Sequence, residues 1–319
     1  MDPEHSRPRS AAGVADGVTV PLVTVVVTAY NREQYIAAAI ESVLAQTFAD
    51  FELLIVDDAS IDATAEIADG YARRDRRVRL VVNERNRGQF PNRNHAAGLV
   101  ATPLFKFHDS DDVMYAHCLQ VMVAALESEP HADFALSGSR SWPGGPSPML
   151  LTPRLAYQRE FLGSGMFQLG PACGLFRSEF FRSIGGFPVA GTASDYVFWA
   201  KACSTGNVLL VAADLFYYRV HPGQELASER TLLDTAAARR QVWRMLNSAD
   251  CPLRGDELEQ AKRNFMFTVL REAWYQLRDG RPRSAAAYLA HTSFGVNAWL
   301  RYLRMPRRST MAGTPVWSA

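Results

Sequence analysis

Residues 51–58 read FELLIVDD, a short apolar run that ends abruptly in two carboxylates. A run of this length, rich in branched aliphatic side chains, is typical of a strand buried on both faces of a parallel sheet. Similar runs occur at residues 22–27, 78–82 and 104–107. Apolar residues at helical spacing separate them, at residues 36–46 (with Asn31 as the expected cap), 62–74 and 92–100. This alternation predicts a doubly wound, mainly parallel, Rossmann-like α/β sheet.

The pattern weakens beyond residue 127 and then becomes helical. Further strand-like runs occur at residues 132–137, 208–211 and 215–218, and the proline- and glycine-rich residues 142–148 predict a loop. Helical spacing dominates residues 231–246, 256–278 and 282–304. We therefore expect a disordered tail (residues 1–20), an α/β domain (21–225) and a C-terminal helical region (226–319).

The composition is that of a folded globular protein and narrows the function. Of 319 residues, 48% are hydrophobic, and 34 Lys and Arg against 33 Asp and Glu leave a net charge of +1. A near-neutral chain argues against a nucleic-acid binder. The cysteines are far apart, which predicts buried thiols in a reducing compartment: Cys118, Cys173, Cys203 and Cys251. No stretch reads as a signal peptide or a membrane span, so we expect a cytoplasmic protein.

Three carboxylates follow the strand-like run 104–107, at Asp109, Asp111 and Asp112. Because the carboxyl ends of parallel strands meet at one rim of a sheet, these side chains should face a ligand crevice. Carboxylates there suit Mg²⁺ or Mn²⁺, ions that are commonly held by one or two carboxylates plus substrate phosphates. The alternative is an acidic turn that caps a helix beginning at Val113.

A second acidic site and a cation lie on neighbouring segments. Asp57 and Asp58 end the run quoted above, and one of these carboxylates is expected to accept hydrogen bonds from a nucleotide base or ribose. The alternative is an Asx-type turn formed with Ser60 and Asp62. Arg93 stands at the start of a short predicted helix, where a guanidinium and a helix N-terminus together suit a diphosphate. The alternative for this arginine is a surface salt bridge.

Four motifs in order give the chain a family resemblance. They are TAYN at residues 28–31, IVDDASID at 55–62, NRG and RN within 86–94, and DSDD at 109–112. Their order and spacing resemble glycosyltransferase family 2, whose members have the GT-A fold, across roughly residues 22–225. The resemblance implies a metal-dependent, inverting hexosyl- or deoxyhexosyltransferase. It would move one sugar from a nucleotide-diphosphate sugar to a hydroxyl-bearing acceptor: a glycan, a lipid-linked saccharide or a small-molecule glycoside.

The resemblance also implies roles for individual residues. The donor nucleotide would lie against Thr28, Ala29, Tyr30, Asp57, Asp58, Arg93 and Ser110. The divalent cation, Mn²⁺ or Mg²⁺, would be held by Asp109, Asp111 and His221, with Asp112 close by. His221 is alternatively an ordinary surface residue. The acceptor side would be formed by residues 161–176, whose alternative role is turn formation and packing.

The match at the catalytic base is incomplete. The family carries an acidic pair here, whereas Ser194 precedes Asp195 in this chain. By resemblance, Asp195 would take the proton of the acceptor hydroxyl; alternatively it is an acidic residue favoured by a helix N-terminus. The departure at Ser194 keeps a second function open, a catalytically degenerate nucleotide-sugar-binding module.

The C-terminal region carries a separate signal. Residues 280–319 contain no Asp or Glu and six arginines: Arg281, Arg283, Arg301, Arg304, Arg307 and Arg308. Aromatic and aliphatic residues alternate with them, among them Tyr288, Trp299 and Tyr302. Such a segment is suited to an anionic membrane surface, where a lipid-linked acceptor would be presented. The alternative is that it packs on the catalytic domain with its arginines solvated.

Overall fold

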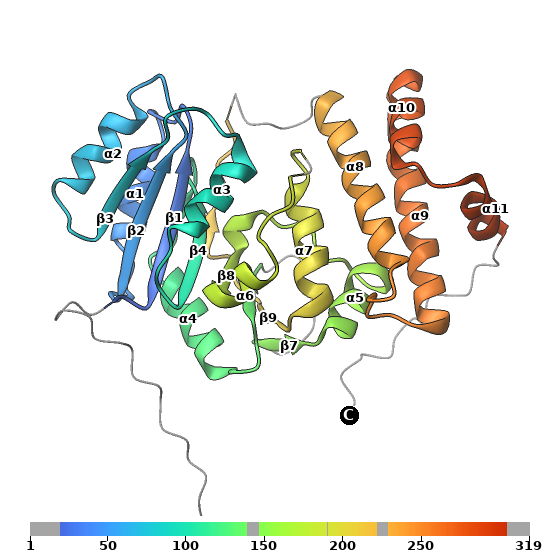
Figure 1. Ribbon diagram of the computed structural model, residues 1–319, viewed down its shortest axis with the longest axis horizontal. Helices are drawn as coiled ribbons and strands as arrows, with labels where there is room; N and C mark the ends of the chain where they lie inside the picture. Colours follow the sequence, from blue (N-terminus) through green and yellow to red (C-terminus); the bar gives the residue numbers. More distant parts are fainter. Residues whose placement is uncertain (1–19, 139–146, 190, 222–228, 305–319) are drawn as a thin grey trace, which may run out of the picture.

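The computed structural model describes residues 20–138, 147–189, 191–221 and 229–304 (Figure 1). Residues 1–19 of the predicted tail (1–20) and residues 142–146 of the predicted loop (142–148) lie outside these residues. The centre is an eight-stranded sheet in the following order: β3 (Val78–Val82), β2 (Phe51–Asp57), β1 (Val23–Ala29), β4 (Leu104–Asp109), β8 (Gly174–Arg177), β6 (Phe134–Ser137), β9 (Val208–Val211) and β7 (Met149–Leu151). The first four of these strands pair in parallel, as the sequence predicts.

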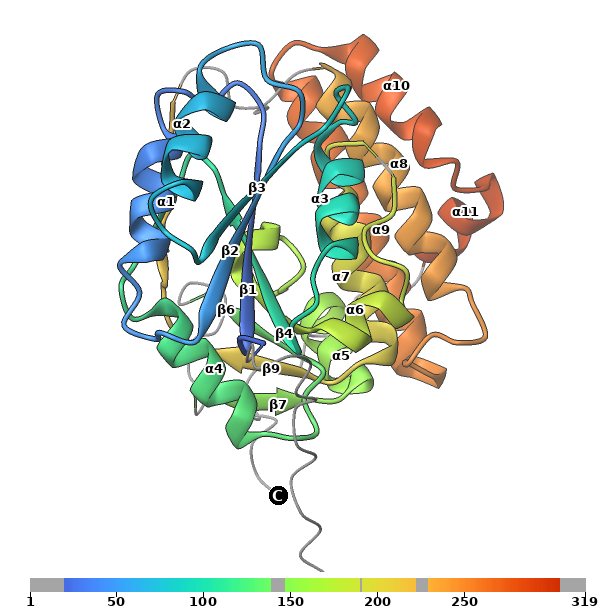
Figure 2. The ribbon, with the colours of Figure 1, turned by 60° about the vertical axis from the view of Figure 1, so that its left-hand side comes forward.

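Helices cover both faces of this sheet (Figure 2). On one face, Val25 and Val27 of β1 share a hydrophobic cluster with α1 (Ile36–Leu44), α2 (Thr64–Ala72) and α4 (Cys118–Ser128). On the other face, Val26 belongs to the cluster of α3 (Gln89–Gly98) and α7 (Ser194–Thr205). Successive side chains of a strand point to opposite faces, so a continuous apolar run requires cover on both. The predicted doubly wound arrangement is therefore confirmed.

The register of the parallel strands explains why the acidic residues gather. Ala29 at the end of β1 pairs with Asp57 at the end of β2, and Thr28 pairs with Asp109 at the end of β4. The carboxylates that follow β2 and β4 therefore flank the end of β1 on both sides. This rim is the place where an open α/β sheet binds its ligand.

The second half of the sheet is mixed and was predicted only in part. Strand β8 lies antiparallel between β4 and β6, and β7 is antiparallel to β9. The sequence reading missed both strands, together with α5 (Pro153–Leu162), the 3₁₀ turn η1 (Pro171–Cys173) and α6 (Ser178–Ser183). These elements are short, so local periodicity distinguishes them poorly from loops.

The expected cap at Asn31 and the alternative helix from Val113 are both wrong. Helix α1 begins at Ile36 after Tyr35, and Asn31 instead has a positive φ of 52° while its Oδ1 accepts a hydrogen bond from the Ile61 N–H (3.0 Å). No helix begins at Val113, because β5 (Val113–Met114) pairs antiparallel with β10 (Phe216–Tyr217). The acidic cluster before β5 therefore does not cap a helix.

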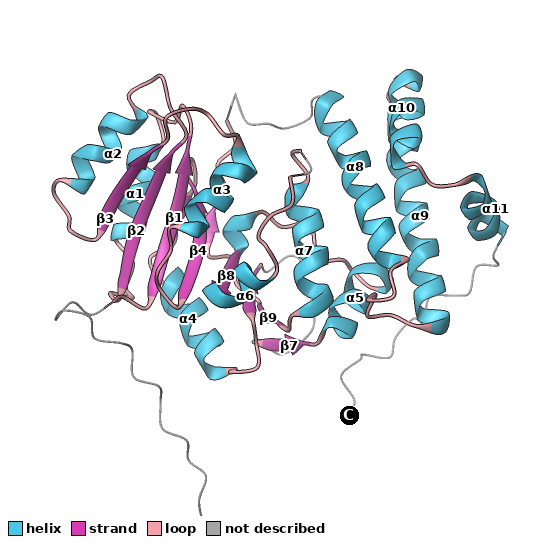
Figure 3. Ribbon diagram, in the orientation of Figure 1, coloured by secondary structure: helices cyan, strands magenta, loops and turns pink. Residues whose placement is uncertain are grey.

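The C-terminal region is helical as predicted, with one correction. It contains α8 (Glu229–Leu246), α9 (Gly255–Arg278), α10 (Pro282–Thr292) and α11 (Val296–Arg304) (Figure 3). The single helix predicted over 282–304 is broken at Ser293, whose φ of 52° turns Phe294 onto the ring of Trp243 in α8. Helix α10 packs on α8 and α9, and these two helices reach the α/β domain through α7 and α5. Over the described parts of the chain, no helix has both the length and the hydropathy to cross a membrane.

Candidate active site

A cavity of about 1030 Å³ opens at the carboxyl rim of the sheet. Nine of the residues singled out from the sequence line it: Thr28, Ala29, Tyr30, Asp58, Arg93, Asp109, Ser110, Asp111 and Asp195. Asp57, Asp112 and His221 lie behind this lining. From the predicted acceptor segment, residues 167–171 face the same cavity, and α8 and α9 supply its far wall.

The two carboxylates at the end of β2, Asp57 and Asp58, have different surroundings. Asp57 is fully buried, and it accepts hydrogen bonds from the Ser60 N–H (2.9 Å) and the Ser60 hydroxyl (2.5 Å). This is the Asx-type turn that the sequence left as an alternative. Asp58 lines the cavity and accepts hydrogen bonds from the N–H groups of Arg87 and Gly88, both at 2.9 Å. Asp58 therefore shapes the loop that forms the cavity wall.

Arg93 is a buried cation with unused hydrogen-bonding capacity. Its Nη2 donates to Asp109 Oδ1 at 2.5 Å, and its side chain is only 6% exposed, so it does not form a surface salt bridge. Its Nε and Nη1 are buried and have no hydrogen-bond partner among the described residues. A buried N–H without a partner costs about 1–3 kcal/mol, so these groups favour an anionic ligand in the cavity.

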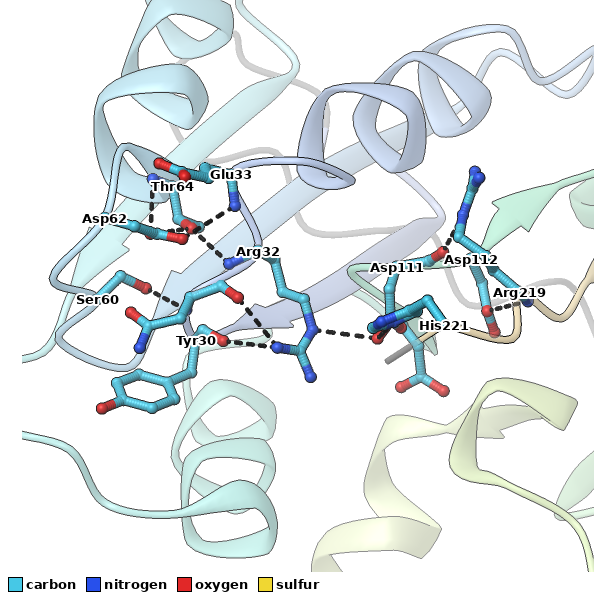
Figure 4. A network of polar contacts seen from close by, with 12 residues as sticks. Tyr30, Arg32, Glu33, Ser60, Asp62, Thr64, Asp111, Asp112, Arg219 and His221 are labelled. Atoms are coloured by element: carbon cyan, nitrogen blue, oxygen red, sulfur yellow. Dashed lines mark hydrogen bonds and ion pairs between the residues drawn. The ribbon is translucent and has the colours of Figure 1, made fainter. Parts of the chain in front are cut away.

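Asp111 stands at the centre of a charged network (Figure 4). Its Oδ2 lies 3.1 Å from Arg32 Nε and 3.1 Å from His221 Nε2. The ring of Tyr35 packs against the His221 imidazole, with 4.3 Å between centroids and the two planes tilted by 34°. The strand pair β5–β10 returns the chain to the acidic cluster and so brings His221 to this point.

The surroundings of Asp111 are compatible with a divalent cation held by few protein ligands. Of the three predicted ligands, Asp111 and His221 face each other, whereas Asp109 is paired with Arg93. Within the described ranges, no group of three or more His, Cys, Asp or Glu side chains could hold a metal. Mg²⁺ needs only one or two protein carboxylates when substrate phosphates complete its coordination. The pair at Asp111 fits that smaller requirement.

The contacts of Asp112 hold two segments of the chain together. Its Oδ1 accepts the Arg219 N–H at 3.0 Å, and the Arg219 side chain donates from Nε to the Asp111 carbonyl at 2.9 Å. Burial raises the pKa of Asp112 to about 7. Asp112 thus ties the segment that carries His221 to the acidic cluster (Figure 4).

Asp195 lies in the first turn of α7 and faces the cavity. Burial raises the pKa of its carboxyl to about 6, although the nearby Arg93 guanidinium acts in the opposite direction. A carboxylate with a pKa close to neutrality is suited to act as a general base. Ser194 beside it is buried, and its hydroxyl donates to the Gly191 carbonyl at 2.7 Å.

The sequence reading missed the residues that α8 and α9 bring to this site. Asp234 of α8 accepts hydrogen bonds from the N–H (2.9 Å) and hydroxyl (3.2 Å) of Thr192, just before α7. Arg239 of α8 and Glu272 of α9 form an ion pair at 2.5 Å in the cavity wall. These helices showed only an amphipathic pattern in the sequence, so no local signal separated wall residues from packing residues.

The fold and the rim geometry agree with a family comparison. A family model described as glycosyl transferase family 2 matches residues 24–184, half of the chain. The chain belongs to glycosyl transferase family 2. The family model ends before α7, so it includes neither Asp195 nor the C-terminal helices.

Individual relatives resemble parts of the chain. The Escherichia coli UDP-Glc:alpha-D-GlcNAc-diphosphoundecaprenol beta-1,3-glucosyltransferase WfgD is 36% identical over 105 residues, which cover 33% of this chain and 41% of WfgD. The S. aureus TarS structure with UDP-GlcNAc has a TM-score of 0.59 at 23% identity and covers 76% of this chain and 71% of TarS. The Pyrobaculum calidifontis mannosyltransferase PcManGT with GDP-Man and Mn²⁺ has a TM-score of 0.56 at 18% identity, covering 91% and 81%.

These matches confirm the GT-A fold, which both structural neighbours share with this chain. The alignments span only about a third to a half of the length of the curated relatives.

Proposed function

We propose that this chain is a nucleotide-sugar-dependent glycosyltransferase that moves one hexose or deoxyhexose, with inversion, to a hydroxyl-bearing acceptor. The proposal is supported above all by three residues that face a single cavity: a buried arginine with unused N–H groups (Arg93), a carboxylate beside a histidine (Asp111) and a carboxylate with a raised pKa (Asp195). The bound UDP-GlcNAc and GDP-Man of the structural neighbours agree with such a donor.

The donor nucleotide is proposed to lie along the end of β1. The segment Thr28–Tyr30, Asp58 and Ser110 line that part of the cavity, and the exposed Tyr30 ring offers a stacking face to a base. Arg93 would bind the diphosphate through the N–H groups that have no partner in the protein. For Asp57, whose carboxylate is used within its own turn, we propose that it shapes this rim.

A divalent ion, Mn²⁺ or Mg²⁺, is proposed to bind at Asp111 and His221. Bound there, it would supply positive charge to stabilise the leaving β-phosphate. Arg32 contacts the same Asp111 oxygen that faces His221, so the ion would displace this contact when it binds. The Mn²⁺ in PcManGT agrees with the proposal but was observed in that protein.

Asp195 is proposed to be the general base. It would take the proton from the acceptor hydroxyl while the oxygen bonds to the anomeric carbon of the donor. The bond from that carbon to the β-phosphate oxygen breaks at the same time, and its electron pair leaves with the nucleoside diphosphate. One displacement of this kind inverts the anomeric centre.

The acceptor is proposed to be a saccharide, either free or lipid-linked as the name of WfgD states for that enzyme. A peripheral contact with an anionic membrane would present a lipid-linked acceptor, and the C-terminal helices are the proposed surface for it. Because all four cysteines are buried free thiols, we propose that transfer takes place in the cytoplasm, at the inner membrane face. No nucleic-acid partner is proposed.

One observation favours the second candidate, a degenerate nucleotide-sugar-binding module. Ser194 replaces the first acid of the family's pair, and its hydroxyl is already used on the Gly191 carbonyl. A protein of that kind would bind the donor normally but would neither transfer nor hydrolyse it.

The proposed function is tested by a thermal-shift panel of UDP, GDP, dTDP and CMP, each with and without Mn²⁺ or Mg²⁺. We expect one nucleoside diphosphate to stabilise the protein in the presence of metal, by about 2.7 kcal/mol at 100 times its Kd. Asp111→Ala should lose the metal-dependent part of this stabilisation. Asp250→Ala, at an exposed carboxylate that does not line the cavity, should retain it.

The panel separates the candidates when it is combined with a hydrolysis assay. Stabilisation together with slow hydrolysis of the matching sugar nucleotide supports a transferase. Stabilisation without hydrolysis or transfer supports the binding module. A folded protein that responds to no nucleotide contradicts both.

A further inference from the structure

The cavity extends from the carboxyl rim of the parallel strands to the C-terminal helices. Its volume of about 1030 Å³ lies at the upper end of the range of about 300–1,000 Å³ that is usual for a small-molecule pocket. The far end is lined by Thr235, Ala238 and Arg239 of α8 and by Glu272 of α9. These residues lie outside the part of the chain that the family model matches.

Asp195 stands between the two ends. Its carboxyl is close enough to Arg93 and Asp109 for both charges to shift its pKa. Its neighbour Tyr196 faces the other way, with its ring 4.4 Å from the Arg239 guanidinium. Figure 1 shows the same order, with α7 between the parallel strands and α8. A ligand that fills the far end therefore reaches the side of Asp195 that is away from the donor.

The charges at the far end are balanced. Arg239 is 6% exposed and pairs with Glu272, which also accepts a hydrogen bond from the Tyr288 hydroxyl. A second carboxylate, Glu160, accepts the Tyr196 hydroxyl at 3.3 Å beneath the same guanidinium. Among the described residues that line this end, no cation lacks a carboxylate partner. A phosphate would therefore meet the Glu272 carboxylate without a free positive charge to offset it.

The remaining surface suits a sugar ring. Phe167, Leu169 and Pro171 supply apolar contact, and the paired side chains of Arg239 and Glu272 supply the polar surface between them. Sugar hydroxyls donate and accept hydrogen bonds, so a neutral sugar can bind a site whose charges cancel. Polar groups set in a mainly apolar wall are the usual design of a pocket that fixes a ligand's orientation.

We infer that the far end of the cavity, between α8, α9 and the loop 167–171, is the acceptor subsite and that it binds a neutral saccharide unit. The inference rests on the proposed function and specifies it further. If the acceptor is lipid-linked, its sugar occupies this subsite and its diphosphate lies outside it. Acceptor choice is then made by the C-terminal helices.

The test fills the subsite and leaves the donor end intact. Thr235→Trp places an indole in the far end, Thr235→Leu fills it less, and Arg244→Trp adds the same indole at an exposed position of α8. The probes are neutral methyl glycosides of common hexoses and N-acetylhexosamines, as mono- and disaccharides, and the corresponding sugar 1-phosphates. Binding is measured by saturation-transfer NMR and calorimetry on the full chain loaded with its nucleoside diphosphate.

We expect a neutral glycoside to bind the wild type and Arg244→Trp alike, and to lose at least tenfold in affinity in Thr235→Trp. Thr235→Leu should fall between them, and the nucleotide Kd should stay within twofold throughout. The inference is overturned if only sugar phosphates bind, if no probe binds the nucleotide-loaded protein, or if both Thr235 variants bind as the wild type does. Failure of nucleotide binding itself would instead reject the proposed function.

Discussion

Asp195 combines exposure to the cavity with a pKa raised to about 6 by burial. A base acts when it is deprotonated, so this pKa places its loss of activity on the acid side of neutrality. We expect kcat/KM to be level above about pH 7 and to fall about tenfold per unit of pH below about 6. A pH–rate profile with donor hydrolysis or transfer as readout checks this, and a profile that stays level down to about pH 4.5 would exclude Asp195 as the base.

The raised pKa of the Asp195 carboxyl also makes the stability of the folded protein depend on pH. Because its pKa is higher in the folded than in the unfolded chain, the folded protein holds the extra proton and loses stability as pH rises between about 4 and 6. Asp195→Asn removes this loss and is expected to lower turnover about 10²–10⁴-fold with nucleotide binding unchanged. Its melting temperature should exceed that of the wild type at about pH 8 and approach it near about pH 4. Equal melting temperatures at both values would contradict the buried environment of Asp195.

The sequence anticipated which carboxylates gather at the rim but not what each one does. Strand ends alone bring Asp57, Asp58, Asp109 and Asp111 together, because parallel strands share one carboxyl edge. Turn geometry then decides that Asp57 bonds to Ser60 while Asp58 faces the cavity. The contact of Arg32 with Asp111 joins residues 79 positions apart, and no local pattern encodes it.

At the scale of elements, α8 holds the loop that leads into the helix of the proposed base. Asp234 of α8 accepts two hydrogen bonds from Thr192, and Gly191 passes so close that a Cβ there would lie 2.1 Å from the Asp234 carboxyl carbon. Gly191 also has a φ of 74°, which other residues rarely adopt. The start of α7 is thus positioned by a helix that lies outside the matched family region.

Breaking this contact should reduce turnover without affecting the donor. We expect Asp234→Ala and Gly191→Ala each to lower kcat roughly 10–100-fold, the size of effect that misplacing a reacting group produces, with nucleotide Kd unchanged. Gly255→Ala is the matched control, since its φ is also positive (53°) but its added Cβ meets no atom within 4 Å. Steady-state kinetics and calorimetry measure the two quantities. An Asp234→Ala variant with normal kcat would show that α7 needs no such support.

The sequence did not predict the elements that depend on contacts between residues far apart in the chain. The parallel half of the sheet follows from apolar runs and their intervening helices, and the structure confirms it. Strand β8 has only four residues and pairs with β4 and β6 from distant parts of the chain. The break at Ser293 depends on Phe294 packing against Trp243, a contact that helical periodicity in residues 282–304 does not reveal.

At the scale of the whole molecule, the structure changes which residues we expect to contact a membrane surface. Two aromatic residues of the predicted membrane segment, Tyr288 and Tyr302, are buried against the other C-terminal helices. That segment packs mainly on α8 and α9 rather than on the catalytic domain, and Arg307 and Arg308 lie outside the described residues. The neighbouring helix α9 instead carries an exposed stripe of alternating aromatic and basic residues, Phe267, Arg271, Trp274 and Arg278.

This α9 stripe is the surface on which we expect anionic vesicles to bind. Its residues follow one another at helical spacing, so they share one face of α9. Trp274 is 61% exposed and Phe267 38%, and the adjacent Asp279 is shared by Arg278 and Arg281, which leaves the stripe basic. Exposed aromatic rings between arginines combine interfacial insertion with attraction of about 1 kcal/mol per basic residue near an anionic surface.

The protein should therefore sediment with vesicles of phosphatidylglycerol and phosphatidylcholine at low salt, and much less with phosphatidylcholine alone. Binding should weaken as salt shortens the screening length toward about 10 Å at 0.1 M. The double variant Phe267→Ala, Trp274→Ala should lose most of the sedimentation, whereas Ile61→Ala, at an 87% exposed apolar residue of the α/β domain, should sediment as the wild type does. Equal sedimentation of the double variant and the wild type would place the membrane contact elsewhere. If the wild type stays in the supernatant at low salt, a lipid-linked acceptor must reach the cavity without this surface.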